Sequence, residues 1–350
     1  MARDPVRVLD DYYLAITLLV TVGYQLAFFA VAFALKFDKL TDFAGGTNFA
    51  LLAALTLALS RRPDTRQLVA SLLLAAWALR LAGFLLFRVL RTGSDARFDG
   101  KRDRFLPFLG FWVFQMLWVW AVSLPVTVLN SPAVQASGYV QRGFGTPCDV
   151  AGVVMFGVGF LVESVSDLQR FLWREKHGGG GGAFCSSGLF ALSRHPNYFG
   201  EILLQFGIFT IAVSPAACGY IGGQPFKALY ATILGPCFLT CLLMFVSGLP
   251  LSERSGAKKR YEKGGETWAN YQRYLERTSV LIPFPPQLYA HLPTFIKRTV
   301  FLEFPMYVFD PAKHADAGQG QAAAEEGNHQ GGDRQSREGL VGKQQQERRS

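Results

Sequence analysis

The sequence predicts an all-α fold, a polytopic membrane bundle of about seven transmembrane helices followed by a disordered C-terminal tail. Half of the 350 residues are hydrophobic and only 17% are charged, whereas soluble proteins carry about 25% charged residues. Seven apolar runs approach or exceed the roughly 20 residues that a helix needs to cross a bilayer. They are residues 12–35, 43–59, 68–90, 105–129, 150–165, 198–220 and 226–249.

The first run is predicted to remain as a transmembrane helix. It is longer than the apolar core of a signal peptide, and Asp10 and Asp11 precede it where a signal peptide carries positive charge. The second and fifth runs are the shortest.

Charge predicts the orientation and the limits of the membrane part. Lysine and arginine gather in loops 36–42, 91–104 and 166–197, which share one side with the C-terminal segment. By the positive-inside rule the C-terminus is cytosolic and the N-terminus lies on the opposite face.

The chain divides into N-terminal helices on the substrate side (1–147), a denser unit (148–310) and a tail (311–350). The tail is rich in Gln, Gly, Ala and charge, so we expect it to be disordered.

Cysteine and histidine residues carry no metal or disulfide pattern. The five cysteines and five histidines are scattered without paired spacing, so no metal site is expected. The glycine run 178–182 lacks the preceding strand and following helix of a phosphate-binding loop, which favours a flexible linker.

The first polar constellation lies where the fifth run ends. Asp167, Arg170 and Arg174 recur at helical spacing and therefore share one face. The two arginines could bind a phosphate, and Asp167 could accept a hydrogen bond from a ribose hydroxyl or an amide. The alternative is a local salt-bridged helix end, which is common and weakly stabilising.

The second constellation opens the sixth run. Pro196 fits the first position of a helix, where its missing N–H is not needed. The neighbouring side chains can then face one pocket, and they are Arg194, His195, Asn197, Tyr198 and Glu201. The alternative is capping, in which Asn197 and Glu201 only complement the helix N-terminus.

A third constellation combines basic and aromatic residues between positions 253 and 284. Trp268, Tyr271 and Tyr274 form a stripe on one helix face, with Lys258, Lys259 and Arg260 upstream. Such a segment fits an amphipathic helix on anionic lipid. It also fits a cationic wall that closes over a phosphate-bearing cofactor.

Polar side chains inside the apolar runs are the candidates for catalysis, and they are Arg80, Gln115 and Glu163. An arginine in the middle of a membrane span usually faces a cavity or a partner, and Glu163 is a plausible counter-charge for Arg80. The alternative is a structural Arg–carboxylate pair that fixes helix packing.

These constellations, in this order, resemble the C-terminal half of the steroid 5-alpha-reductase superfamily, and most closely its DUF1295 branch of multi-span proteins. The resemblance covers about residues 148–286. It rests on Ser166–Phe171, Phe184–Phe190, Ser193–Glu201 and the closing segment from Trp268 to Phe284. A weaker likeness lies at Leu79–Ala82 with Arg88.

The resemblance implies a membrane-embedded reductase that binds NADPH from the cytosol. Asp167, Arg170 and Arg174 would contact the nucleotide together with Arg194, His195 and Tyr198. Asn197 would hold the nicotinamide carboxamide with support from Glu201, and Tyr271 would close the phosphate side. The substrate would be a steroid-like, isoprenoid or fatty lipid with an activated double bond. The Glu and Tyr that hold the substrate carbonyl in better-known steroid reductases have no evident equivalent in residues 1–147.

Two alternatives come from the same architecture. The string Arg194-His195-Pro196 also resembles isoprenylcysteine carboxyl methyltransferases and phospholipid methyltransferases, which use S-adenosylmethionine, although Asn197 and Glu201 favour the reductases. A scaffold protein that kept the fold without the chemistry is the other alternative. In each case we expect the bilayer and a lipophilic small molecule as partners, no nucleic acid, and the endoplasmic reticulum if the chain is eukaryotic.

Overall fold

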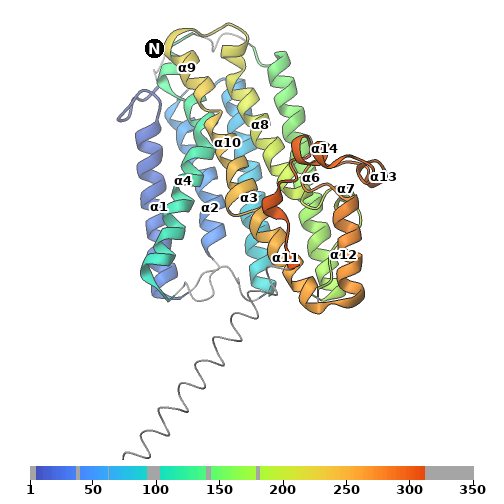
Figure 1. Ribbon diagram of the computed structural model, residues 1–350. Coiled ribbons are helices and arrows are strands. Elements are labelled where there is room, and N and C mark those ends of the chain that lie inside the picture. Colours follow the sequence, from blue (N-terminus) through green and yellow to red (C-terminus); the bar gives the residue numbers. More distant parts are fainter. Residues whose placement is uncertain are drawn as a thin grey trace, which may run out of the picture.

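The computed structural model describes residues 5–36, 40–61, 63–92, 103–138, 143–178 and 182–311 (Figure 1). Residues 312–350, which hold nearly all of the predicted tail, lie outside the described residues. The described elements are helical: α1 Leu14–Ala34, α2 Thr41–Leu59, α3 Thr65–Thr92, α4 Phe105–Leu129, α5 Pro132–Gln135, α6 Pro147–His177, α7 Leu189–Leu192, α8 Pro196–Ala217, α9 Gly223–Ala231, α10 Leu234–Cys241, the π-helical η4 Leu242–Val246, α11 Leu249–Lys263, α12 Gly265–Arg277, α13 Pro286–Tyr289, α14 Thr294–Thr299 and the 3-10 turn η5 Pro305–Tyr307.

The predicted seven-helix membrane bundle is confirmed. Seven helical stretches of the described chain are long and apolar enough to cross a membrane, and each overlaps one of the predicted runs. The fifth is longer than expected, because α6 continues through the polar residues up to His177. Much of the predicted loop 166–197 is therefore helix. The seventh stretch is interrupted at η4 and continues as α11, so it carries the chain beyond the apolar run.

The closest helix pair is α6 with α8, which run antiparallel. Gly152 lies against Gly207, and Gly159 lies against Gly200. A Cβ atom on Gly159 would lie 2.5 Å from the carbonyl oxygen of Gly200, and a Cβ atom on Gly152 would lie 2.7 Å from that of Gly207. Glycines seven residues apart on both helices thus let the two backbones touch, as small residues do in membrane helix pairs.

One hydrophobic core joins both halves of the chain. It combines Phe49 and Trp77 of the N-terminal helices with Leu204 and Ile208 of α8. The predicted division at residue 147 stays a prediction.

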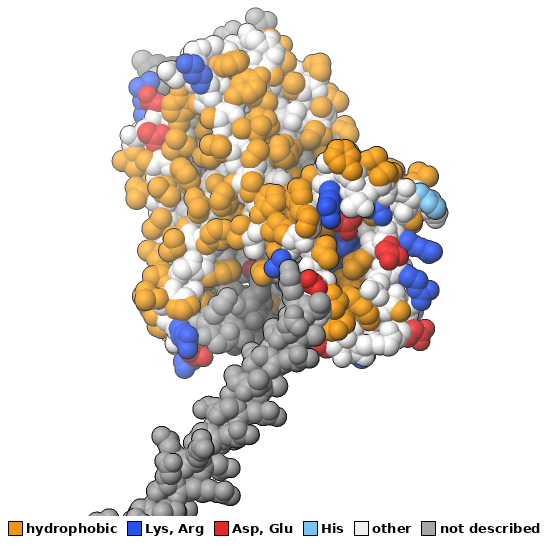
Figure 2. Space-filling view, viewed as in Figure 1, with side chains coloured by type: hydrophobic (Ala, Val, Ile, Leu, Met, Phe, Trp, Pro, Cys, Tyr) orange, Lys and Arg blue, Asp and Glu red, His pale blue; other side chains and the backbone are white. Residues whose placement is uncertain are grey.

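Hydrophobic side chains cover the sides of the bundle in Figure 2, while charged side chains gather over the lobe formed by α11–α14. An apolar outer surface is what a bilayer requires.

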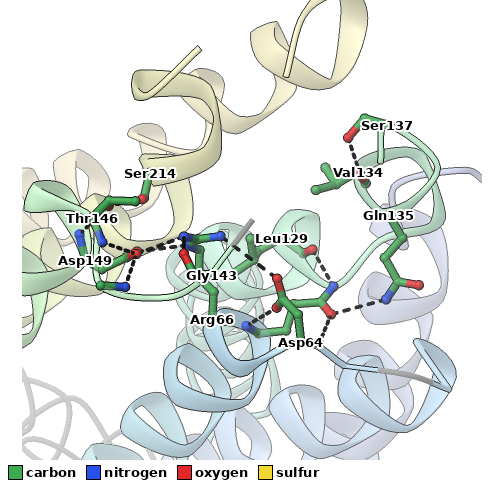
Figure 3. A network of polar contacts seen from close by, with 12 residues as sticks. Asp64, Arg66, Leu129, Val134, Gln135, Ser137, Gly143, Thr146, Asp149 and Ser214 are labelled. Atoms are coloured by element: carbon green, nitrogen blue, oxygen red, sulfur yellow. Dashed lines mark hydrogen bonds and ion pairs between the residues drawn. The ribbon is translucent and has the colours of Figure 1, made fainter. Parts of the chain in front are cut away.

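A buried ion pair fastens the beginnings of α3 and α6 (Figure 3). Arg66 donates from Nε and from Nη2 to the two carboxylate oxygens of Asp149, each at 2.8 Å, and both side chains are inaccessible to solvent. Asp149 also belongs to a capping box with Thr146, which starts α6. Asp64 lies 3.9 Å from the same guanidinium. A buried pair of this kind fixes helix register, because separating Arg66 from Asp149 would break several buried hydrogen bonds at once.

Buried amides connect the first, second and fourth helices. Gln115 donates to Gln25 Oε1 and to the backbone oxygen of Thr41, each at 2.9 Å, and Gln25 donates to Asn48 at 3.1 Å. Both N–H groups of the Gln115 amide are therefore engaged in helix packing.

The lobe at the end of the bundle opposite α9 contains α11 and α12 (Figure 1). The remaining chain folds back onto it: Tyr307 donates to the carbonyl of Met244 at 2.9 Å, and Arg254 donates to that of Met306 at 2.7 Å. These contacts hold the segment 286–307 against η4 and α11.

Candidate functional site

A cavity of about 560 Å³ lies between the end of α6, the beginning of α8, and helices α11 and α12. Its size is in the range of small-molecule and cofactor sites. The residues that line it are Arg170, Trp173, Arg174, Gly178, Gly182, Ala183, Phe184, Cys185, Phe190, Arg194, His195, Ser252, Glu253, Ser255, Gly256, Lys259, Arg260, Tyr271 and Tyr274.

Four cations of the cavity wall form no salt bridge with a described carboxylate. Among the described residues, none of Arg170, Arg174, Lys259 and Arg260 takes part in a salt bridge. Two of them are held by rings and backbone: the Arg170 guanidinium lies 5.0 Å from the Phe190 ring centre, and Arg260 donates to the Gly256 carbonyl at 2.6 Å. Arg174 and Lys259 are exposed, whereas Arg170 and Arg260 are half-buried. Several cations on the wall of one cavity attract an anionic ligand.

The fifth cation, Arg194, is neutralised. Its Nη1 donates to Glu253 at 2.5 Å and its Nη2 donates to Glu303. Burial alone would lower the pKa of Arg194, but the two carboxylates outweigh burial and raise this pKa. Glu303 also accepts a hydrogen bond from Tyr289 at 2.6 Å. Arg194 therefore joins α8, α11 and the segment after α12.

His195 continues this network. Its Nε2 lies 2.6 Å from Glu253 Oε1, and its ring stacks on Tyr198 with 5.1 Å between centres. Burial lowers the pKa of His195 and outweighs Glu253, whose hydrogen bond and negative charge raise it; the positive charges of Arg170 and Arg194 lower it further. The imidazole is therefore neutral at pH 7.

Aromatic faces complete the wall. Arg260 lies 4.3 Å from the Tyr271 ring centre and 5.3 Å from that of Phe184. Burial raises the pKa of Tyr271 to about 12, so its hydroxyl stays protonated. Trp268, part of the predicted aromatic stripe, packs against Tyr261 and Tyr271.

A second polar cluster lies further into the bundle, between α3, α6 and α8. Arg80 pairs with Glu163 and, at 2.7 Å, with Asp167. Trp77 donates to Glu163 at 3.2 Å. Glu201 of α8 is close enough to Arg80 and Asp167 to interact electrostatically. The expected Arg80–Glu163 pair is thus present. Asp167 and Arg170 are three residues apart, which places them on the same side of α6 and about 4.5 Å apart along its axis. The cluster and the cavity therefore share one side of α6.

The predicted site residues therefore fall into two neighbouring groups. The cavity collects Arg170, Arg174, Arg194, His195 and Tyr271, while Asp167 and Glu201 join the Arg80 cluster.

Asn197 and Tyr198 are absent from the cavity lining. Pro196 is the first residue of α8, as predicted, and no side chain caps the helix. Asn197 does not act as the cap that the alternative interpretation required. Its Oδ1 is buried without a partner among the described residues.

Sequence reasoning assigned no role to several residues of the wall and of the network behind it. Trp173 carried no signal beyond its aromatic ring, and Phe184 appeared only within the matched segment Phe184–Phe190. Glu253 stood in the third constellation as an unassigned charge, although a carboxylate facing Arg-His-Pro could have been suspected. Glu303 and Tyr289 follow the apolar runs, and nothing local marks them.

The comparisons with known proteins give a family but no characterised relative. One family model, described as "Protein of unknown function (DUF1295)", matches residues 28–278. No curated protein and no solved structure matches the chain.

Proposed function

This chain belongs to the DUF1295 family, and from its cavity we propose that it is a membrane-embedded reductase that uses NADPH on a double bond of an apolar lipid. One observation carries the proposal. The cavity wall holds four cations without a salt bridge to a described carboxylate, together with aromatic faces. NADPH carries several phosphate charges and flat rings, so it matches both features.

The cationic wall disfavours S-adenosylmethionine. That cofactor carries a positive sulfonium centre, which Arg170, Arg174, Lys259 and Arg260 would repel, and Glu253 is already neutralised by Arg194. The methyltransferase function therefore remains only as an outcome of the test.

The residues present fit a dinucleotide in the following way. We assign the phosphates to Arg170, Arg174, Lys259 and Arg260, and a flat ring to Tyr271 and Phe184. A bound nicotinamide would supply hydride. Asn197 does not line the cavity, but its Oδ1 is buried without a partner among the described residues, so it is the proposed acceptor for a carboxamide that reaches past His195, and Glu201 lies one turn further along α8.

The substrate is proposed to approach from the bilayer toward the Arg80 cluster. Arg80 holds Glu163 and Asp167 in an otherwise apolar part of the bundle. A guanidinium fixed there can polarise a carbonyl, since its charge acts in a medium of low dielectric constant. Gln115 is a weaker candidate because both of its amide N–H groups are engaged elsewhere.

The test is ligand binding to the purified full chain in detergent. NADPH, NADH and S-adenosylmethionine are titrated separately, with NADPH followed by its fluorescence. We expect binding of NADPH that weakens as salt is raised, and no binding of S-adenosylmethionine. Binding of S-adenosylmethionine alone would replace the reductase by a methyltransferase. Binding of neither cofactor would favour a non-catalytic membrane protein.

A further inference from the structure

His195 has one ring nitrogen committed to the protein. Its Nε2 lies 2.6 Å from Glu253 Oε1. Because the other oxygen of Glu253 accepts from Arg194 at 2.5 Å, the carboxylate is ionised and can only accept. The proton of the neutral imidazole is therefore assigned to Nε2, and Nδ1 carries a lone pair.

The contacts behind Glu253 hold this arrangement in place. Arg194 is tied to Glu303, and Glu303 accepts from the Tyr289 hydroxyl at 2.6 Å. A ring nitrogen whose hydrogen bond is fixed from behind determines the tautomer of the whole ring. The network thus presets which kind of hydrogen bond the other nitrogen of His195 can make.

The Nδ1 atom of His195 is unpaired. It is buried and has no hydrogen-bond partner among the described residues, and the side chain is 97% shielded from solvent, with 3% exposed. The same residue borders the cavity. A buried acceptor without a partner destabilises a protein, so such groups generally pair with a ligand or water.

We propose that His195 Nδ1 accepts a hydrogen bond from an N–H or O–H group of the ligand that fills the cavity. This inference rests on the proposed function, and it adds an orientation to it. The four cations that form no salt bridge with a described residue are donors and bind the phosphate end of the ligand. His195 presents an acceptor and binds a part that carries a donor, such as an amide or a ribose hydroxyl.

Two isosteric variants separate ligand contact from a merely structural role. Asparagine places a polar atom near the position of Nδ1 and none at Nε2. Glutamine places one near Nε2 and none at Nδ1. His195→Asn therefore keeps an acceptor for the ligand and loses Glu253, whereas His195→Gln keeps Glu253 and loses the acceptor.

The experiment measures NADPH binding to the full-length wild type, H195N and H195Q, with thermal melting as the check on folding. We expect H195N to bind within about threefold of wild type and H195Q to bind about tenfold to hundredfold more weakly. The reverse order, equal loss in both variants, or no loss in either would overturn the proposal. If wild type binds no NADPH, the proposed function fails and this inference fails with it.

A measurement on the wild type covers the case in which the variants do not fold. Nitrogen NMR of the selectively labelled histidine reports the tautomer and the hydrogen bond at each ring nitrogen. Addition of NADPH should shift the Nδ1 resonance toward that of a hydrogen-bonded acceptor and leave Nε2 unchanged. An unchanged Nδ1 resonance in the NADPH-bound protein would refute the contact.

Discussion

Gly159 of α6 and Gly200 of α8 approach so closely that a Cβ atom on either one would lie within 2.6 Å of the carbonyl oxygen of the other. A real Cβ atom does not tolerate such a distance, so any side chain here separates the helices. These helices also carry Glu163 and Glu201 beside the contact and lead into the cavity at Arg170 and His195. The glycine contact therefore positions both polar groups of the site.

Gly159→Ala is expected to destabilise the protein by about 1–3 kcal/mol, because an inserted methyl group forces two backbones apart. Gly157→Ala is the matched control. A Cβ atom on Gly157 meets nothing within 4 Å, and alanine favours the helix by about 0.5–1 kcal/mol. Thermal melting in detergent measures both variants. Equal melting temperatures would contradict the close approach.

Asp149→Asn is expected to cost about 1–3 kcal/mol, because the buried Arg66 guanidinium loses the carboxylate that accepts two of its hydrogen bonds and keeps only the more distant Asp64 at 3.9 Å. Asp11→Asn serves as the control. Asp11 pairs with Arg7 at 3.4 Å, but both side chains are more than half exposed, at 52% and 72%, so the change should stay within about 0.5 kcal/mol. Chemical unfolding of the two variants gives the comparison. Similar losses would mean that the Arg66 pair is solvated.

Lys259→Gln is expected to weaken NADPH binding about tenfold and to flatten its dependence on salt, because one phosphate contact is lost. Lys258→Gln should leave the affinity unchanged. Its side chain is 51% exposed, pairs with Glu262 at 3.7 Å and does not line the cavity. Titrations at two salt concentrations measure the effect. Equal losses in both variants would indicate attraction by net charge alone.

The stability that His195 contributes is expected to fall below pH 6.5. Its pKa is lowered from 6.5 in the folded protein, so on acidification the unfolded chain takes up the proton first. The contribution is complete above pH 6.5 and decreases below it by up to about 1.4 kcal/mol per pH unit.

Thermal melting of wild type and H195N between pH 7.5 and 5.5 measures the pH-dependent stability that His195 contributes, because asparagine does not titrate. The advantage of wild type should shrink toward acid. An advantage that grows toward acid would show a charged imidazole, and the assigned tautomer would be wrong.

Local features of the sequence determined the seven membrane helices and the start of α8. Hydropathy fixes which segments leave water, and Pro196 marks a first helical turn whatever the rest of the chain does. Helical spacing likewise placed Asp167, Arg170 and Arg174 on one side of α6. Hydropathy did not predict where α6 ends. A helix can continue beyond its apolar run when polar residues such as Asp167 and Glu175 gain partners.

Only the tertiary structure decided which charges meet. Arg194 binds Glu253 and Glu303, which lie 59 and 109 residues away along the chain, and no periodicity connects positions so distant. The same folding put Asp167 beside Arg80, outside the cavity, and left Arg170, Arg174 and Lys259 on the cavity wall without a salt bridge to a described residue. Spacing along one helix determines which side chains share a face. Whether a charge on that face is neutralised or left for a ligand depends on the helices packed against it.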